Sequence, residues 1–171
     1  MSLNPFSRDS EHLLQIYLND HRAGAVVGLA VAKRLADSND GTELGATVSE
    51  IAAEIEDEQR SLDLLFEHFG LHQNPLKQTA ALVGERLGRF KMNGRLASYS
   101  PLSRLWEVEA LMAGIDAKRS MWLSLRTAAG EDRIADVDLV ELTERADSQR
   151  ARLFGHHQDA ARDALTPEPD S

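Results

Sequence analysis

The chain has 171 residues, of which 42% are hydrophobic, so it is long enough to bury a core and form one domain. It contains no cysteine, which excludes disulfides, iron–sulfur clusters and thiolate zinc sites. Its formal net charge of −9 disfavours binding of nucleic acid or of an anionic membrane by the surface as a whole.

The first half of the chain contains two segments whose apolar residues recur at steps of three and four, the spacing of one helical face. The first segment predicts a helix over about 10–36, followed by turn-forming residues at 37–41. The second predicts a helix over 43–69, because Thr42 is a good N-cap and Gly70 suits the left-handed position just past a helix.

The second half contains two further segments of this kind. A helix is expected over 101–129, since Ser100 can cap it and Pro101 suits its first position. Another is expected over about 138–165, because Asp138 and a glutamate three residues later resemble a capping box.

The links between these helices predict the topology. Short links join the first helix to the second and the third to the fourth, whereas residues 70–100 form a long crossover with a short helix that starts at Asn74-Pro75. Long helices of equal length bury their apolar faces best side by side. The sequence therefore predicts a single all-α domain over 1–171, an antiparallel four-helix bundle of two hairpins joined by a long crossover, with a disordered tail at 166–171.

Neither a signal peptide nor a membrane span is expected. Residues 1–5 lack a basic start and an apolar run. The most apolar stretch, 23–32, is much shorter than the about 20 residues that a transmembrane helix needs. We therefore expect a cytoplasmic protein that does not contact membranes.

Acidic residues recur in both halves of the chain. Glu54 and Asp57 lie three residues apart on the second helix, as Glu144 and Asp147 do on the fourth. Two hairpins, one crossover and these acidic pairs resemble the ferritin-like superfamily over roughly residues 10–165. The stretches YLNDH and SYSPLSR also resemble a group of bacterial helical proteins of unassigned activity.

The ferritin-like resemblance implies carboxylates that converge on two metal ions. Because neither Glu-x-x-His motif is preserved, a di-iron oxidase or an iron store is not expected. Oxygen ligands suit iron or manganese. The candidate ligands are His21, Glu54, Asp57, Glu58, Glu109, Glu144 and Asp147.

Each candidate also has a simpler interpretation. Glu58 lies within the apolar stripe of its helix, so it either reaches water at the edge of the stripe or is neutralised by a metal, a proton or an arginine. His21 fits a hydrogen-bonded core histidine better than a metal ligand. The acidic residues of the third and fourth helices fit surface ion pairs.

Gly24 and Gly28, with alanines around them, make part of the first helix thin. Small residues allow close approach of another helix, within the bundle or between subunits, and this tight packing is the favoured interpretation. The alternative is a cavity beside the glycines that suits a small apolar ligand.

The crossover is basic in an acidic chain. Residues 71–104 hold six basic residues and one acidic residue, a charge of +5, so the remainder carries −14. The strap either lies on an acidic face of this or another subunit, which we favour, or binds phosphate or nucleic acid. The residues concerned are Arg86, Arg89, Lys91 and Arg95.

No phosphate loop, Ser-His-Asp arrangement or dinucleotide motif is present in the sequence. This favours a non-catalytic ferritin-like protein that self-associates, most simply as a homodimer, or binds a partner. The alternatives are a carboxylate-rich iron or manganese protein and a protein that binds phosphate or nucleic acid through the crossover, although nucleic acid is disfavoured by the net charge.

Overall fold

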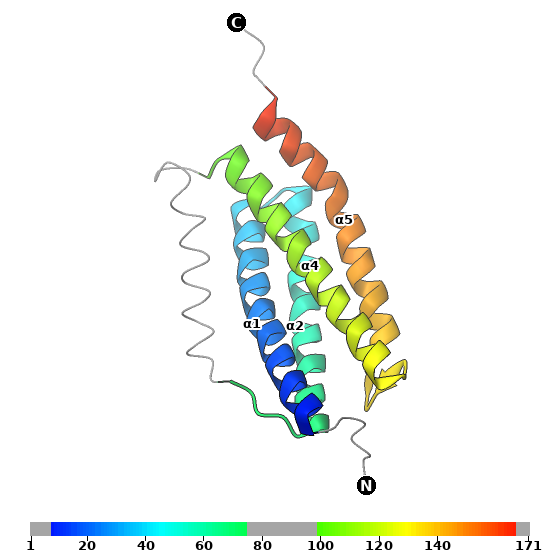
Figure 1. Cartoon of the computed structure of the whole chain (residues 1–171). Coiled ribbons are helices and arrows are strands. Elements are labelled where there is room, and N and C mark those ends of the chain that lie inside the picture. Colours follow the sequence, from blue (N-terminus) through cyan, green and yellow to red (C-terminus); the bar gives the residue numbers. More distant parts are fainter. Residues whose placement is uncertain (1–7, 75–98, 167–171) are drawn as a thin grey trace, which may run out of the picture.

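The computed structural model of the chain describes residues 8–74 and 99–166. Within these ranges the protein is all-α, apart from one short β-hairpin (Figure 1). No helix of the described ranges is long and apolar enough to cross a membrane. The elements are α1 (Arg8–Ser38), α2 (Glu43–Phe69), α4 (Pro101–Ala129), β1 (Arg133–Ile134), β2 (Val137–Asp138) and α5 (Leu139–Leu165).

Helix α2 begins and ends where the sequence predicts. The hydroxyl oxygen of Thr42 accepts a hydrogen bond from the backbone N–H of Gly45 at 3.1 Å, which satisfies one donor of the first turn. Gly70 follows the helix with a φ of 64°, a left-handed conformation that costs glycine little. The predicted bounds 43–69 are therefore confirmed.

Helix α4 is bounded by the same two devices. The hydroxyl oxygen of Ser100 accepts a hydrogen bond from the backbone N–H of Ser103 at 3.1 Å, and Pro101 is the first helical residue. Gly130 ends the helix with a φ of 69°. The predicted bounds 101–129 are confirmed as well.

The other two helices differ slightly from the prediction. Helix α1 extends beyond the predicted 10–36 at both ends. Its last turn continues because the side-chain amide of Asn39 donates a hydrogen bond to the carbonyl oxygen of Leu35 at 2.7 Å. Helix α5 begins at Leu139, because Asp138 acts as its cap and accepts from two backbone N–H groups of the first turn at 3.1 and 3.0 Å.

A two-stranded hairpin joins α4 to α5 and was not predicted. Strands β1 and β2 pair antiparallel, with Ile134 opposite Val137. Both side chains are buried and belong to one of the two apolar clusters of the core. Ala135 in the turn has a φ of 52°, which a two-residue hairpin turn requires. Strands of two residues are too short to show the alternation by which strands are recognised in a sequence.

The four long helices lie side by side (Figure 1). Helices α1 and α5 run in one direction and α2 and α4 in the other. Helix α1 packs against α2 and α4, and α4 packs against α5. The predicted crossover is described only at 70–74 and 99–100, so its predicted short helix lies outside the described residues, as does the predicted tail beyond residue 166.

The core consists of two apolar clusters, one after the other along the helices. On α2 the first cluster ends at Ile55 and the second begins at Leu62. On α4 the corresponding residues are Ile115 and Met121. The residues between these limits therefore lie at the junction of the two clusters.

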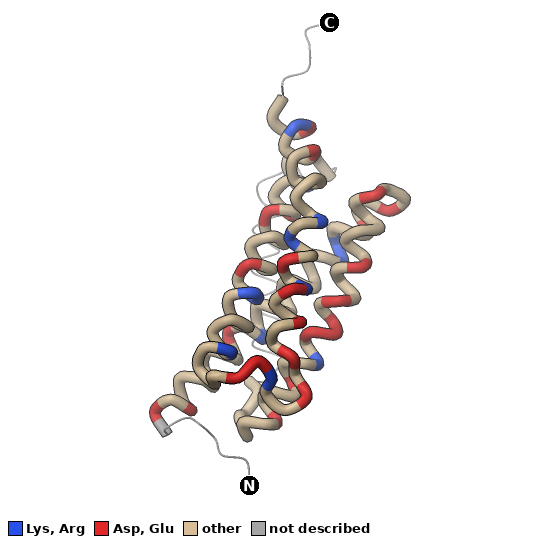
Figure 2. Tube along the Cα trace, turned by 90° about the vertical axis from the view of Figure 1, so that its right-hand side faces the viewer, with Lys and Arg blue, Asp and Glu red and all other residues tan. Residues whose placement is uncertain are grey.

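Acidic residues are distributed along the helices, with fewer basic residues among them (Figure 2). Many of them pair between neighbouring helices. Lys33 of α1 contacts Glu56 of α2 at 2.6 Å, and Arg119 of α4 contacts Asp147 of α5, also at 2.6 Å. Such exposed pairs contribute little to stability, about 0–1 kcal/mol each.

Candidate functional site

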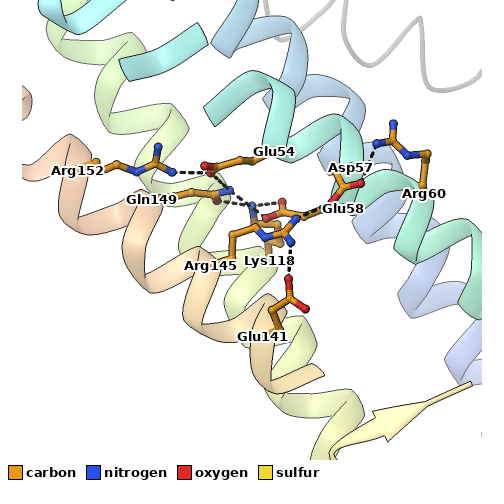
Figure 3. Close-up of polar contacts among 9 residues, drawn as sticks. All are labelled: Glu54, Asp57, Glu58, Arg60, Lys118, Glu141, Arg145, Gln149 and Arg152. Atoms are coloured by element: carbon orange, nitrogen blue, oxygen red, sulfur yellow. Dashed lines mark hydrogen bonds and ion pairs between the residues drawn. The ribbon is translucent and has the colours of Figure 1, made fainter. Parts of the chain in front are cut away.

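A polar network occupies the junction of the two apolar clusters. The carboxylate of Glu58 on α2 is only 3% exposed and forms an ion pair with Lys118 of α4 (Figure 3). Gln149 of α5 is fully buried beside them. Its amide oxygen accepts from the Lys118 ammonium at 2.6 Å, and its amide nitrogen donates to Glu58 at 3.0 Å. The three side chains are thus mutually hydrogen-bonded.

Glu54 extends the network toward the surface, one helical turn before Glu58. The amide nitrogen of Gln149 donates its second hydrogen to the Glu54 carboxylate at 2.8 Å. Arg152 of α5 forms an ion pair with the same carboxylate oxygen. Like charges four residues apart on a helix repel unless something neutralises them. In this protein Gln149, Arg152 and Lys118 do so.

Asp57 lies beside this network, where Arg145 of α5 holds it. Arg145 donates to the Asp57 carboxylate at 2.7 Å and to Glu141 at 2.6 Å (Figure 3). Arg60 pairs with Asp57 from the same helix at 2.7 Å. The hydrogen bond from Arg145 is the main reason why the pKa of Asp57 is lowered from its ordinary value.

Burial changes the titration of the central pair. It raises the pKa of Glu58 and lowers the pKa of Lys118, because a charge is less stable away from water. The attraction between the two groups opposes both shifts. Removing both charges from water costs free energy. The attraction between Glu58 and Lys118 and their hydrogen bonds to Gln149 offset this cost.

The prediction that Glu58 reaches water at the edge of the stripe is wrong. Its carboxylate lies in the interior and is neutralised by a lysine, a partner that was not considered. Lys118 and Gln149 could have been found, because each occupies a position of an otherwise apolar stripe. On α4 Lys118 follows Ile115 by three residues, and on α5 Gln149 follows a buried alanine by three.

A cavity of about 370 Å³ lies between α1, α2 and α4, directly beside this ion pair. Its walls are mainly apolar, and Glu58 and Lys118 form part of them. Exposed small residues of α1 and α4 border it, among them Gly24 and Gly114. The apolar wall is built from Val27, Val31, Ile55, Leu62, Leu111, Ile115 and Met121.

The small residues create this space. A Cβ atom placed on Gly24, Gly28 or Gly114 would meet no atom of the described chain within 4 Å. Close packing of these glycines within the bundle, one half of the favoured interpretation, is therefore not found among the described residues, whereas close packing between subunits stays a prediction. The alternative, a cavity beside them, is what the structure contains.

His21 of α1 lies on the wall of the same cavity. It is half-buried, and its ring contacts the ring of Tyr17 edge-on with 4.6 Å between centroids. Burial lowers the pKa of His21, and the negative charge of Asp20 partly opposes this.

The remaining predicted ligands lie at the surface of α4 and α5. Glu109 contacts His157 at 3.3 Å, Asp147 pairs with Arg119, and Glu144 is exposed. Residues 8–74 and 99–166 contain no group of three or more His, Asp or Glu side chains that could hold a metal ion.

The predicted phosphate-binding residues lie outside the described part of the chain. They are Arg86, Arg89, Lys91 and Arg95. Arg104, the last basic residue of the same stretch, is described and pairs with Asp163 of α5 at 3.2 Å. Phosphate binding by the crossover stays a prediction.

Comparison of the chain with models of protein families, with curated proteins and with solved structures found no match. What the protein does is therefore inferred from its own side chains. Two features stand out for this purpose: the apolar cavity and the ion pair beside it.

Proposed function

We propose that this protein is a non-catalytic, ferritin-like four-helix bundle that binds a small, mainly apolar molecule in the cavity between α1, α2 and α4. The observation that carries this proposal is the cavity itself. Its volume of about 370 Å³ falls within the range of ligand pockets, about 300–1,000 Å³. The opposite directions of α1 and α2 and of α4 and α5, with a long link between the pairs, support the ferritin-like arrangement.

The composition of the wall favours an apolar ligand. Aliphatic side chains and glycines supply most of it, and they offer no hydrogen bonds to water. Apolar cavities of this kind take up hydrocarbon molecules, because the ligand gains dispersion contacts that water cannot provide. Burial of the ligand surface is then the main source of affinity.

The ion pair supports a binding role rather than a catalytic one. Glu58 and Lys118 neutralise each other, and Gln149 is hydrogen-bonded to both. A general base or a nucleophile needs a free electron pair directed at the substrate. Both groups are already engaged, so they serve the cavity as a fixed polar wall.

Filling the cavity tests the proposal. We expect n-butylbenzene to bind to the wild-type protein in isothermal titration calorimetry. Gly28→Leu places a side chain in the open space beside α1 and should weaken this binding by about tenfold or more. Gly155→Leu is the matched control, because Gly155 also has free space around it but lies exposed on α5. Binding that Gly28→Leu leaves unchanged would exclude the cavity as the site.

Self-association is a second candidate. Leu13 and Ile16 are 66% and 47% exposed, and their spacing of three residues places them on one face of α1. Exposed apolar side chains that lie together are typical of interfaces. A dimer should dissociate in sedimentation velocity when Leu13→Glu is introduced, whereas Leu165→Glu, at another exposed leucine, should have no effect. A single monomeric species at high concentration would exclude this candidate.

A further inference from the structure

Two hydrogen-bond donors of the cavity wall have no partner among the described residues. They are the indole N–H of Trp122 on α4 and the side-chain amide nitrogen of Gln59 on α2. Both nitrogens are buried, and Trp122 is only 1% exposed. A buried donor without an acceptor is unfavourable, so native proteins pair nearly all of them.

The two donors lie on one side of the cavity, on the wall that α2 and α4 provide. Gln59 follows Glu58 directly on α2, and Trp122 lies one helical turn after Lys118 on α4. Both donors therefore belong to the part of the wall that α2 and α4 provide, next to the ion pair. The opposite part, from α1, presents the glycines, Val27 and the half-buried His21, and among the described residues it contributes no buried donor that lacks a partner.

We propose that the ligand carries one neutral hydrogen-bond acceptor, a carbonyl oxygen such as that of a ketone or an ester, on an apolar body. This inference rests on the proposed binding function. An indole N–H can only donate, so its partner must be an acceptor. A carbonyl oxygen has two lone pairs and so has the capacity to accept from both donors.

The ion pair argues against an anionic ligand. Glu58 already carries the negative charge that Lys118 neutralises, and both line the cavity. A carboxylate placed beside them would be a third buried charge without a counter-ion, which is strongly unfavourable at low dielectric. A neutral carbonyl satisfies the donors and adds no net charge.

A matched pair of probes tests the inference. Butyrophenone and n-butylbenzene have nearly the same shape, but only the ketone has an acceptor. We expect the ketone to bind the wild-type protein about tenfold more tightly than the hydrocarbon in titration calorimetry. We also expect the indole N–H resonance of Trp122 to move downfield in ¹H–¹⁵N spectra when the ketone binds. The indole of Trp106, which does not line the cavity, is the internal control.

Variants assign the effect to the two donors. Trp122→Phe removes the indole N–H and leaves a smaller apolar ring, and Gln59→Met replaces the amide by an apolar side chain of similar length. Each should reduce the advantage of the ketone over n-butylbenzene to about threefold. The ratio of the two affinities is the readout, because Trp122→Phe also enlarges the cavity. Gln158→Met, at an exposed glutamine of α5, should reproduce the wild-type affinities.

The possible outcomes separate the two proposals. If n-butylbenzene binds and the ketone binds no better, with the Trp122 resonance unmoved, the inference about the acceptor is overturned and the binding function stands. If neither probe binds, both proposals fail. If Trp122→Phe does not fold, the Gln59→Met result decides, because Gln59 is not part of the apolar clusters.

Discussion

Glu58 of α2 and Lys118 of α4 form an ion pair in the interior, with side chains that are 3% and 14% exposed. The pair lies where one apolar cluster ends and the next begins. It is hydrogen-bonded to a fully buried glutamine, Gln149. Desolvation makes such a pair costly to form, and the loss of one member costs still more.

Removing only one member of this pair should destabilise the protein strongly. Lys118→Met leaves a buried carboxylate without its counter-ion and should lower the free energy of unfolding by about 3–5 kcal/mol. The double variant Glu58→Leu/Lys118→Met leaves no unpaired charge, but it takes two partners from the buried amide of Gln149. It should therefore be more stable than Lys118→Met and lie about 1–3 kcal/mol below the wild type. Urea denaturation measures both.

An exposed pair provides the control for this cycle. Arg162 and Asp159 contact each other at 2.7 Å, but both are 69% exposed. Arg162→Met should therefore change the free energy of unfolding by less than about 0.5 kcal/mol. A double variant that loses as much stability as the single variants Glu58→Leu and Lys118→Met together would contradict the argument.

Two glycines in helices should respond oppositely to the same substitution. A Cβ on Gly45 would lie 2.2 Å from the backbone oxygen of Asn39, so Gly45→Ala must displace the turn before α2 and should cost about 2 kcal/mol or more. A Cβ on Gly155 meets no described atom within 4 Å, so Gly155→Ala should stabilise the helix by about 1 kcal/mol. Thermal denaturation of the two variants checks this, and equal effects would refute it.

The cap of α5 should make stability depend on acid pH. The backbone N–H of Glu141 and the side chain of Arg133 lower the pKa of Asp138 from its ordinary value of 3.8. A carboxyl whose pKa is lower in the folded state stabilises the fold above its unfolded pKa, and this contribution disappears as pH falls through the folded pKa. Asp138→Asn keeps the cap without the charge. The wild type should therefore melt at a higher temperature than the variant near pH 7, by a margin that shrinks below pH 3.8. A constant margin would contradict the assignment.

Metal content is expected to be low. Lys118, Arg145 and Arg152 already neutralise the carboxylates that α2 turns toward α5. These basic side chains thus occupy the positions beside the carboxylates that a metal ion would need. Elemental analysis of untagged protein prepared without chelator should find iron and manganese far below one ion per chain. Near-stoichiometric metal that is lost on Glu54→Ala would revive the metalloprotein hypothesis.

The helices could be predicted from the sequence because their ends are encoded locally. Thr42 and Gly70 bound α2 through contacts within a few residues, and Ser100 and Gly130 do the same for α4. The predicted range of helix α1 was shorter than the observed helix. The hydrogen bond from Asn39 that extends the helix depends on a side-chain rotamer, which the sequence does not specify. Local chemistry therefore determines most of the secondary structure.

The site was harder to predict because its partners come from different helices. The sequence places Glu58 in an apolar stripe but does not say which residue of α4 lies opposite. Lys118 interrupts the apolar stripe of α4, and this interruption was the only indication in the sequence that Lys118 could be the partner of Glu58. The cavity depends in the same way on how far apart α1 and α4 pack, which Gly24 and Gly114 permit but do not dictate.

The buried network also determines how the helices line up lengthwise. Apolar side chains tolerate a shift of one helix past another, since one leucine can replace the next in a contact. A shift of α4 by one turn would move Lys118 by about 5.4 Å and leave Glu58 and Gln149 without it. A shift of α2 past α4 thus buries an unpaired charge. We infer that the ion pair favours one register of α2 against α4 among those that the apolar stripes alone would accept.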